Sequence, residues 1–229
     1  MHTSKHLFLF INMATTADGK IATANRAVST FGSPRDHAHL LALRATADAV
    51  MAGARTVDSA PVNLGPGAAR YRRQRLARGL AEYNLRVIVS GGGSINPRAE
   101  IFRHRFSPIL ILTTDRIPAA KLQRLRELAD EVKLCGRETI DFPAALRWLR
   151  EQWGVQRLAC EGGAELNAAL FREQLVDELH VTFCPKIFGG RRAPTIADGP
   201  GAPSLAEAAP FRIKSLRRTG EELFAVFAR

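Results

Sequence analysis

The chain has 229 residues, of which 46% are hydrophobic and 24% charged, and it carries a formal net charge of +11. This length can bury a full hydrophobic core, and the composition is that of an ordinary globular protein. Disordered, collagen-like and coiled-coil chains are therefore excluded.

Short apolar runs alternate along the chain with longer segments of helical periodicity. This alternation predicts an α/β fold with helices flanking a sheet, and continuous apolar runs are typical of strands covered on both faces. Because neither flank of the two irregular loops is large enough to fold alone, we expect a single domain over residues 1–229. The expected strands are residues 7–13, 49–52, 85–89, 109–112, 158–161, 178–184 and 223–227.

Helices with recognisable starts separate these strands. Ser33 offers a capping hydroxyl before Pro34, and Asp36 adds negative charge in the first turn. The expected helices are residues 34–45, 118–128, 141–153 and 164–173, with a short arginine-rich helix after the irregular segment 61–67. A further loop rich in Gly, Ala and Pro is expected at residues 194–210.

The cysteines and the apolar runs bear on the compartment. Cys135, Cys160 and Cys184 are odd in number, widely spaced and next to apolar residues, which argues against a disulfide framework and predicts a reducing, cytoplasmic location. The apolar run 7–11 is much too short to cross a bilayer, so no membrane span is expected. No metalloenzyme or hydrolase motif occurs, and we expect no metal.

The positive charge is concentrated in one segment. A solvated helix face is the favoured interpretation, and an anion-binding patch is the alternative. Only Tyr71 interrupts the run with an aromatic ring, so a stacking platform for nucleic acid is not indicated and nucleic-acid binding is unlikely. The arginines of this run are Arg70, Arg72, Arg73, Arg75 and Arg78.

A glycine turn follows the strand that ends near Glu161. Gly162 and Gly163 lead directly into the helix that begins at Ala164. Glycine allows a phosphate to approach the backbone, and the N–H groups of a helix start favour an anion. A tight turn without a ligand is an equally good interpretation of this segment alone, and it is not a dinucleotide-binding fingerprint of the Rossmann type.

Three more polar or glycine-rich turns follow apolar strands. They are residues 15–22 around Asp18-Gly19, residues 53–57 (Gly-Ala-Arg-Thr-Val) and residues 89–94 (Val-Ser-Gly-Gly-Gly-Ser). Each has a plain structural interpretation as a surface turn, a helix cap or a hairpin. Because open α/β sheets bind ligands at the carboxyl ends of their strands, the four turns together predict a phosphate-binding rim.

In this order the segments resemble the riboflavin-biosynthesis reductase family, which includes the C-terminal domain of the bacterial bifunctional deaminase-reductase and stand-alone archaeal and fungal relatives. The resemblance covers nearly the whole chain, and no deaminase segment with a zinc signature precedes it, so the chain looks like the stand-alone form. The matching segments are residues 16–22, 43–45, 48–50, 53–57, 161–163, 166–167, 175–179 and 185–190.

The resemblance implies a dihydrofolate-reductase-like fold with a mainly parallel sheet, a homodimer, and NADPH as the hydride donor to a phosphoribosylamino-pyrimidine. It places Glu161 and Asp18 in catalytic roles, and Asn12, Ser29 and Arg44 against the substrate. Asn12 matches the archaeal members, where many bacterial ones have lysine. The residues implied to line NADPH are Ala14, Gly53, Thr56, Val89, Ser90, Gly91, Gly162, Gly163, Ala164, Glu165, Leu166 and Asn167.

One departure affects the substrate. After Thr56-Val57 the family usually has Asp-Asp-Pro-x-Leu-Thr and then a basic residue, whereas this chain has Asp58-Ser59-Ala60-Pro61. The second acid is lost and the matching arginine is not identifiable. A reductase of another heterocycle, such as a pterin or dihydrofolate, is therefore an alternative, and a non-catalytic nucleic-acid or anion binder is a minor one.

Overall fold

The computed structural model describes residues 6–26, 31–59 and 61–229. These residues form two compact units: the first contains residues 6–8 and 41–159, and the second contains residues 9–26, 31–40 and 160–229. Both units combine strands with helices, and most of their strand pairs are parallel, which confirms the predicted α/β class. The single domain over residues 1–229 stays a prediction.

The first unit is built on parallel strands in the order β5-β4-β3-β2-β6. β4 is buried at every residue, and β2 and β3 are buried except at partly exposed ends, as the continuous apolar runs predicted. The pairs β2–β3, β3–β4 and β4–β5 are parallel, so the carboxyl ends of these strands share one edge. The strands are β2 (Ala49–Gly53), β3 (Leu85–Val89), β4 (Ile109–Thr113), β5 (Glu131–Leu134) and β6 (Arg157–Cys160, whose last residue belongs to the second unit).

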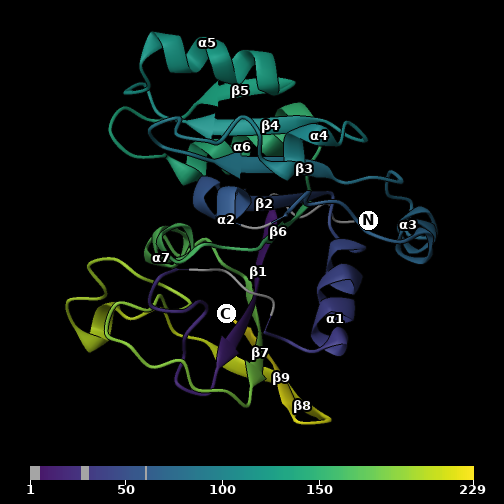
Figure 1. Cartoon of the computed structure of the whole chain (residues 1–229), viewed down its shortest axis with the longest axis vertical. Helices are drawn as coiled ribbons and strands as arrows, with labels where there is room; N and C mark the ends of the chain where they lie inside the picture. Colours follow the sequence, from purple (N-terminus) through teal and green to yellow (C-terminus); the bar gives the residue numbers. More distant parts are fainter. Residues whose placement is uncertain (1–5, 27–30, 60) are drawn as a thin grey trace. The chain divides into compact units, whose positions relative to one another are not determined.

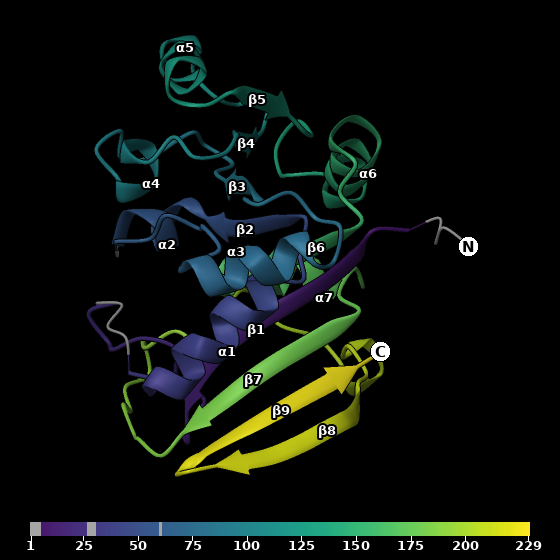
Figure 2. The same ribbon diagram turned by 90° about the vertical axis from the view of Figure 1, so that its right-hand side faces the viewer.

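Helices cover both faces of these strands, with α2 and α4 on one side and α6 on the other (Figure 2). Asp141 caps α6 by accepting a hydrogen bond from the Ala144 N–H, and Gly154 ends it in the left-handed region. The helices are α2 (Ala54–Ser59), α3 (Ala69–Leu76), α4 (Glu100–Arg103), α5 (Ala119–Leu128) and α6 (Phe142–Trp153). Among the described residues, no helix has the length and apolar character needed to cross a membrane.

The second unit contains the strands β1-β7-β9-β8, in that order. β1 and β7 are parallel, whereas β9 runs antiparallel to both β7 and β8. Helix α1, which continues into the first unit, and helix α7 lie on opposite sides of β1 and β7 (Figure 1). The elements are β1 (Phe8–Thr16), α1 (Pro34–Arg44), α7 (Ala164–Arg172), β7 (Glu178–Cys184), a short 3-10 turn (Leu205–Glu207), β8 (Arg212–Thr219) and β9 (Glu222–Ala228).

Most predicted elements are confirmed. β3 and β7 have the predicted bounds, and the other predicted strands and helices agree within three residues. β5, β8, α2 and α4 were not predicted. β8 has the sequence Arg-Ile-Lys-Ser-Leu-Arg-Arg-Thr and is almost entirely exposed, so it lacks the apolar signal on which a strand prediction depends.

Candidate active site

The predicted phosphate-binding turn lies at the start of α7. Gly162 has φ +83°, and a Cβ atom there would lie 3.0 Å from Met13 Sδ, so the backbone at this point requires glycine. Gly163 is the residue before the helix, and no side chain caps the N–H groups of the first turn. These N–H donors suit an anion, because they are not used inside the helix.

A segment from residue 186 to residue 198 ties this turn to the Asp18 turn. At one end, Asn167 Nδ2 donates to the Ile196 carbonyl (2.8 Å) and the Asp198 N–H donates to the Ala164 carbonyl (3.2 Å). At the other end, the Ala17 N–H donates to the Lys186 carbonyl (2.9 Å), and between the two ends Lys20 Nζ donates to the Ala193 carbonyl (3.2 Å). We call residues 186–198 the strap. It joins two predicted site segments that lie far apart in the sequence.

The carboxylate of Asp18 is bonded to the strap. Its carboxylate accepts hydrogen bonds from the Gly189 N–H (2.7 Å), the Phe188 N–H (3.2 Å) and the Thr16 hydroxyl (2.5 Å). The Thr16 hydroxyl, and then these backbone donors, lower the pKa of Asp18 below its ordinary value. An ionised carboxylate with its oxygens engaged is suited to positioning the loop, so a positioning role fits Asp18 better than the expected catalytic one.

Asn12 and Ala14 lie on β1 in the same unit. Asn12 is only 8% exposed, and its Oδ1 atom has no hydrogen-bond partner among the described residues. It pairs in register with His180 of β7, and the next residue, Met13, packs against Gly162. A buried acceptor without a donor is unfavourable unless a ligand completes it, so Asn12 fits its predicted role towards a substrate.

Glu161 stands between β6 and the Gly162-Gly163 turn, where its side chain is partly buried. This position is compatible with its expected acid–base role, which stays a prediction. Ser29, the other residue expected to face the substrate, lies outside the described residues.

The remaining residues that are expected to line the cofactor belong to the first unit. Gly53 ends β2 and pairs with Val89, the last residue of β3, so both strand ends lie at one edge. Thr56 follows in α2, and the Asp58 carboxylate accepts a hydrogen bond from the Asn96 N–H (3.0 Å). Burial raises the pKa of Asp58, and its bond to Asn96 opposes this rise.

The turn after β3 carries a cation that the sequence did not reveal. Ser90 begins the turn, and the Gly91 carbonyl accepts a hydrogen bond from the Thr114 hydroxyl (2.7 Å). Lys121 of α5 donates to the Ser94 hydroxyl (2.9 Å). Nothing in the spacing of Ser94 and Lys121, which stand far apart in the sequence, could have predicted this contact.

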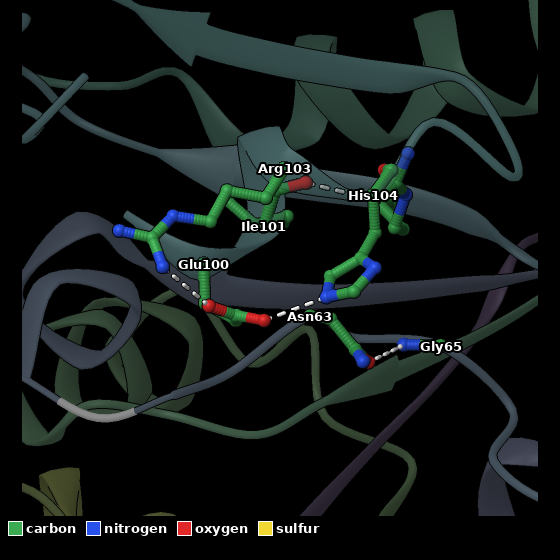
Figure 3. A network of polar contacts seen from close by, with 7 residues as sticks. Asn63, Gly65, Glu100, Ile101, Arg103 and His104 are labelled. Atoms are coloured by element: carbon green, nitrogen blue, oxygen red, sulfur yellow. Dashed lines mark hydrogen bonds and ion pairs between the residues drawn. The ribbon is translucent and has the colours of Figure 1, made fainter. Parts of the chain in front are cut away.

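The loop that departs from the family pattern is fixed by its own contacts. Asn63 accepts a hydrogen bond from the Gly65 N–H (2.9 Å), and Arg44, which is buried, donates to the Gly65 carbonyl (2.6 Å). Figure 3 shows the Asn63 side chain turned towards Gly65, and Glu100 between Arg103 and His104. Arg44 therefore has a structural partner, and its predicted role towards a phosphate stays a prediction.

The interpretation of the arginine run as one solvated face is wrong for Arg75. This side chain is fully buried and donates to the carbonyls of Arg44, Ala47 and Ala81. The sequence could not distinguish it from its exposed neighbours, because an arginine that binds backbone carbonyls needs no acidic partner. Arg72 pairs with Glu82 (2.9 Å) near the surface.

The two units therefore collect the predicted residues in two separate groups. The second unit brings together Asn12, Ala14, Asp18, Glu161 and the start of α7, and the first brings together the strand ends at Gly53 and Ser90. Both groups offer free backbone and small side chains, which suit a phosphorylated ligand. Among the described residues, no group of three or more His, Cys, Asp or Glu side chains could hold a metal ion.

Comparisons with known proteins give this chemistry a family. The model of the RibD C-terminal domain matches residues 7–225. A protein of Archaeoglobus fulgidus named 2,5-diamino-6-ribosylamino-4(3H)-pyrimidinone 5′-phosphate reductase is 32% identical over 97% of both chains. A protein of the same name from Methanothermobacter thermautotrophicus is 30% identical over 96% of this chain and 97% of its own.

Solved structures share the fold at lower identity. The riboflavin biosynthesis reductase of Saccharomyces cerevisiae superposes with a TM-score of 0.72 at 14% identity, and covers 100% of this chain and 92% of its own. Acinetobacter baumannii RibD gives a TM-score of 0.75 at 19% identity over 97% of this chain, which spans 58% of that RibD chain. These structures support the dihydrofolate-reductase-like fold that the motifs implied. The chain belongs to the RibD C-terminal domain family.

Proposed function

We propose that this protein is an NADPH-dependent reductase that converts the ribosylamino group of 2,5-diamino-6-ribosylamino-4(3H)-pyrimidinone 5′-phosphate into a ribitylamino group, a step of riboflavin biosynthesis. The relatives that carry this name match almost the whole chain. The structural observation that carries the proposal is the buried, unpartnered Oδ1 of Asn12, beside the Met13–Gly162 contact. A ring that bears amino groups supplies the N–H donor that this acceptor lacks.

When bound, NADPH would supply a hydride to carbon 1′ of the opened sugar, and the protein's task would be to bind and orient the two reactants and to exclude water. The N–H groups of Gly163 and Ala164 at the uncapped start of α7 would hold a phosphate of the cofactor. The bare backbone at Gly162 fits this purpose, because a side chain there would meet Met13. The residues of the turn thus fit a dinucleotide phosphate by their chemistry.

On the substrate side, Asn12 Oδ1 orients the pyrimidine by accepting a hydrogen bond from one of its N–H groups. Asp18 keeps the loop after β1 in place through Phe188 and Gly189, so that water is excluded from the reacting carbon. Glu161 is our candidate for the group that exchanges a proton with the substrate, because it borders the phosphate turn and is partly buried.

The direct test measures NADPH oxidation at 340 nm with the phosphoribosylamino-pyrimidine, with and without protein. We expect substrate-dependent oxidation by the protein, and dihydrofolate and a pterin serve as rival acceptors. Oxidation with none of these acceptors would overturn the proposal. Oxidation with dihydrofolate alone would favour the alternative reductase.

Asn12→Leu tests the site itself. Losing one hydrogen bond to the substrate should raise KM about tenfold. Stabilisation of the variant by NADPH alone should equal that of the unaltered protein, since Asn12 faces the substrate. An unchanged KM would remove Asn12 from the substrate site.

We also propose that the protein is a cytoplasmic homodimer. The three cysteines are free, as in a reducing compartment. On β8 and β9, Ile213, Leu216 and Leu223 share one face and are 66%, 60% and 41% exposed, which gives an apolar surface for a second copy. Leu216→Glu should shift the mass in light scattering towards the monomer, whereas Ser215→Glu, on the opposite face, should not. Equal masses for both variants would rule out this surface.

A further inference from the structure

The residues expected to line the cofactor do not explain a choice between NADPH and NADH. Those described are neutral except for Glu165, which is acidic. NADPH differs from NADH by a 2′-phosphate on the adenosine ribose, and a phosphate in a protein site is usually held by a cation together with hydrogen-bond donors. A cation beside one of the predicted turns would account for a preference for NADPH.

The turn from Ser90 to Ser94 is a rigid platform at the carboxyl end of β3. The Gly93 N–H donates to the Ser90 carbonyl (3.1 Å), and Gly93 has φ +65° with its Cα close against Ile117, where a Cβ would collide. The Gly91 carbonyl accepts from the hydroxyls of Thr113 and Thr114, so the turn is tied to β4. Gly91 and Gly92 are exposed, and open space lies above Gly92.

Lys121 brings a positive charge to this platform. Its Nζ donates to the Ser94 hydroxyl (2.9 Å), and it makes no ion pair within the described part of the chain. Arg116, from the loop before α5, is in contrast paired with Glu138 (3.2 Å). An ammonium group has three donors, so the contact with Ser94 leaves two of them for a ligand.

We propose that Lys121 and Ser94 bind the 2′-phosphate of NADPH and thereby select NADPH over NADH. The exposed backbone of Gly91 and Gly92 lets the adenosine ribose approach the turn, and the ammonium and hydroxyl groups contact its phosphate. This inference rests on the proposed function, because it concerns the NADPH that the proposed reaction uses.

The test compares Lys121→Gln with the unaltered protein by thermal stabilisation in NADPH, NADH, adenosine 2′,5′-bisphosphate and adenosine 5′-phosphate. Loss of a charged hydrogen bond to phosphate should weaken the binding of NADPH about tenfold or more and leave the binding of NADH unchanged. The 2′,5′-bisphosphate should lose its advantage over adenosine 5′-phosphate in the variant. Lys121→Arg should restore much of the preference, and Ser94→Ala should lose part of it.

Arg126→Gln is the matched control, because it removes one positive charge from the exposed surface of the same helix. It should bind both dinucleotides like the unaltered protein. An equal loss in Arg126→Gln and Lys121→Gln would mean that only the overall charge of the helix matters, and would overturn the proposal. Unaltered preference for NADPH in Lys121→Gln would overturn it as well.

The failure of this inference is distinguishable from the failure of the proposed function. If the unaltered protein oxidises NADPH with the pyrimidine substrate but Lys121→Gln keeps the same preference, only the assignment of Lys121 and Ser94 is wrong. If the unaltered protein is stabilised by neither dinucleotide and oxidises neither, both proposals are wrong.

Discussion

The turns after β6 and after β3 carry the same signal in the sequence, an apolar strand that runs into glycines, yet they differ in chemistry. The turn after β6 leads into α7 and offers uncapped backbone N–H groups, with Gly162 pressed against Met13. The turn after β3 is exposed at Gly91 and Gly92 and carries the ammonium group of Lys121. One turn thus suits a phosphate held by the backbone, and the other a phosphate held by side chains.

Glycine therefore has two separate uses in these turns. At Gly162 it is required by the protein itself, since φ is positive and a side chain would meet Met13. At Gly91 a Cβ would come no closer than 3.9 Å to Thr114, so the folded protein alone does not require glycine there. A need for glycine at Gly91 would therefore come from a ligand.

Alanine substitutions at Gly162 and Gly91 should have the largest and most different effects. Gly162→Ala should lower the free energy of unfolding by about 1–3 kcal/mol, because alanine must adopt a left-handed conformation and displace Met13. Gly91→Ala should change the free energy of unfolding by less than about 0.5 kcal/mol but weaken the binding of NADPH. Urea denaturation and NADPH titration of both variants measure the two effects. Equal losses of stability would refute the distinction.

The strands that position both turns were predictable, because their residues are mostly apolar and apolar runs predict buried strands. β3 is a continuous apolar run apart from Arg86, and Ile109–Thr113 is buried at every residue. The edge strand β8 was not predictable, since four of its eight residues are basic and it contributes little to a core. Its pairing with β9 is a tertiary effect that local residue types do not encode.

The site was predictable where the chain itself brings residues together and not where the fold does. Glycine turns at strand ends are local features, so Gly162 and Gly91 could be identified. The contact between Lys121 and Ser94, and the contact between His39 and His180 (ring centroids 6.1 Å apart), join distant segments.

Each turn is anchored by a side-chain hydrogen bond, and the two bonds should differ in their contribution to stability. Asn167 is fully buried, and its Nδ2 donates to the Ile196 carbonyl of the strap. Asn167→Ala should lower the free energy of unfolding by about 1–3 kcal/mol, because a buried acceptor loses its donor. Thr114→Val in the other turn should lower it by less, because the Gly91 carbonyl keeps Thr113 as a donor. A larger loss in Thr114→Val than in Asn167→Ala would contradict this ranking.

The smallest expected effect separates the two units by pH. In the second unit, burial lowers the pKa of His39, and the nearby His180 and Arg217 lower it further. His39 contacts His180 and Phe224, and His180 is paired with Glu178, which also binds Lys214. On α1 itself, Asp36 has a raised pKa because of burial, opposed by Thr182 and reinforced by Glu222.

The direction in which stability changes with pH depends on which state, folded or unfolded, takes up the proton first. The unfolded chain protonates His39 as the pH falls below about 6.5, whereas the folded state takes up this proton only at a lower pH. Stability is therefore lost as the pH falls through this window. The loss should not exceed about 1 kcal/mol per pH unit. Asp36 acts in the opposite direction at more acidic pH, because the folded state binds its proton more readily than the unfolded chain does.

Hydrogen exchange should therefore show β7 and β9 losing more protection than β3 and β4 between pH 7.5 and pH 5.5. His39→Gln should remove the difference, His104→Gln on the exposed surface of the first unit should not, and an unaltered pH response in His39→Gln would exclude His39 as its cause.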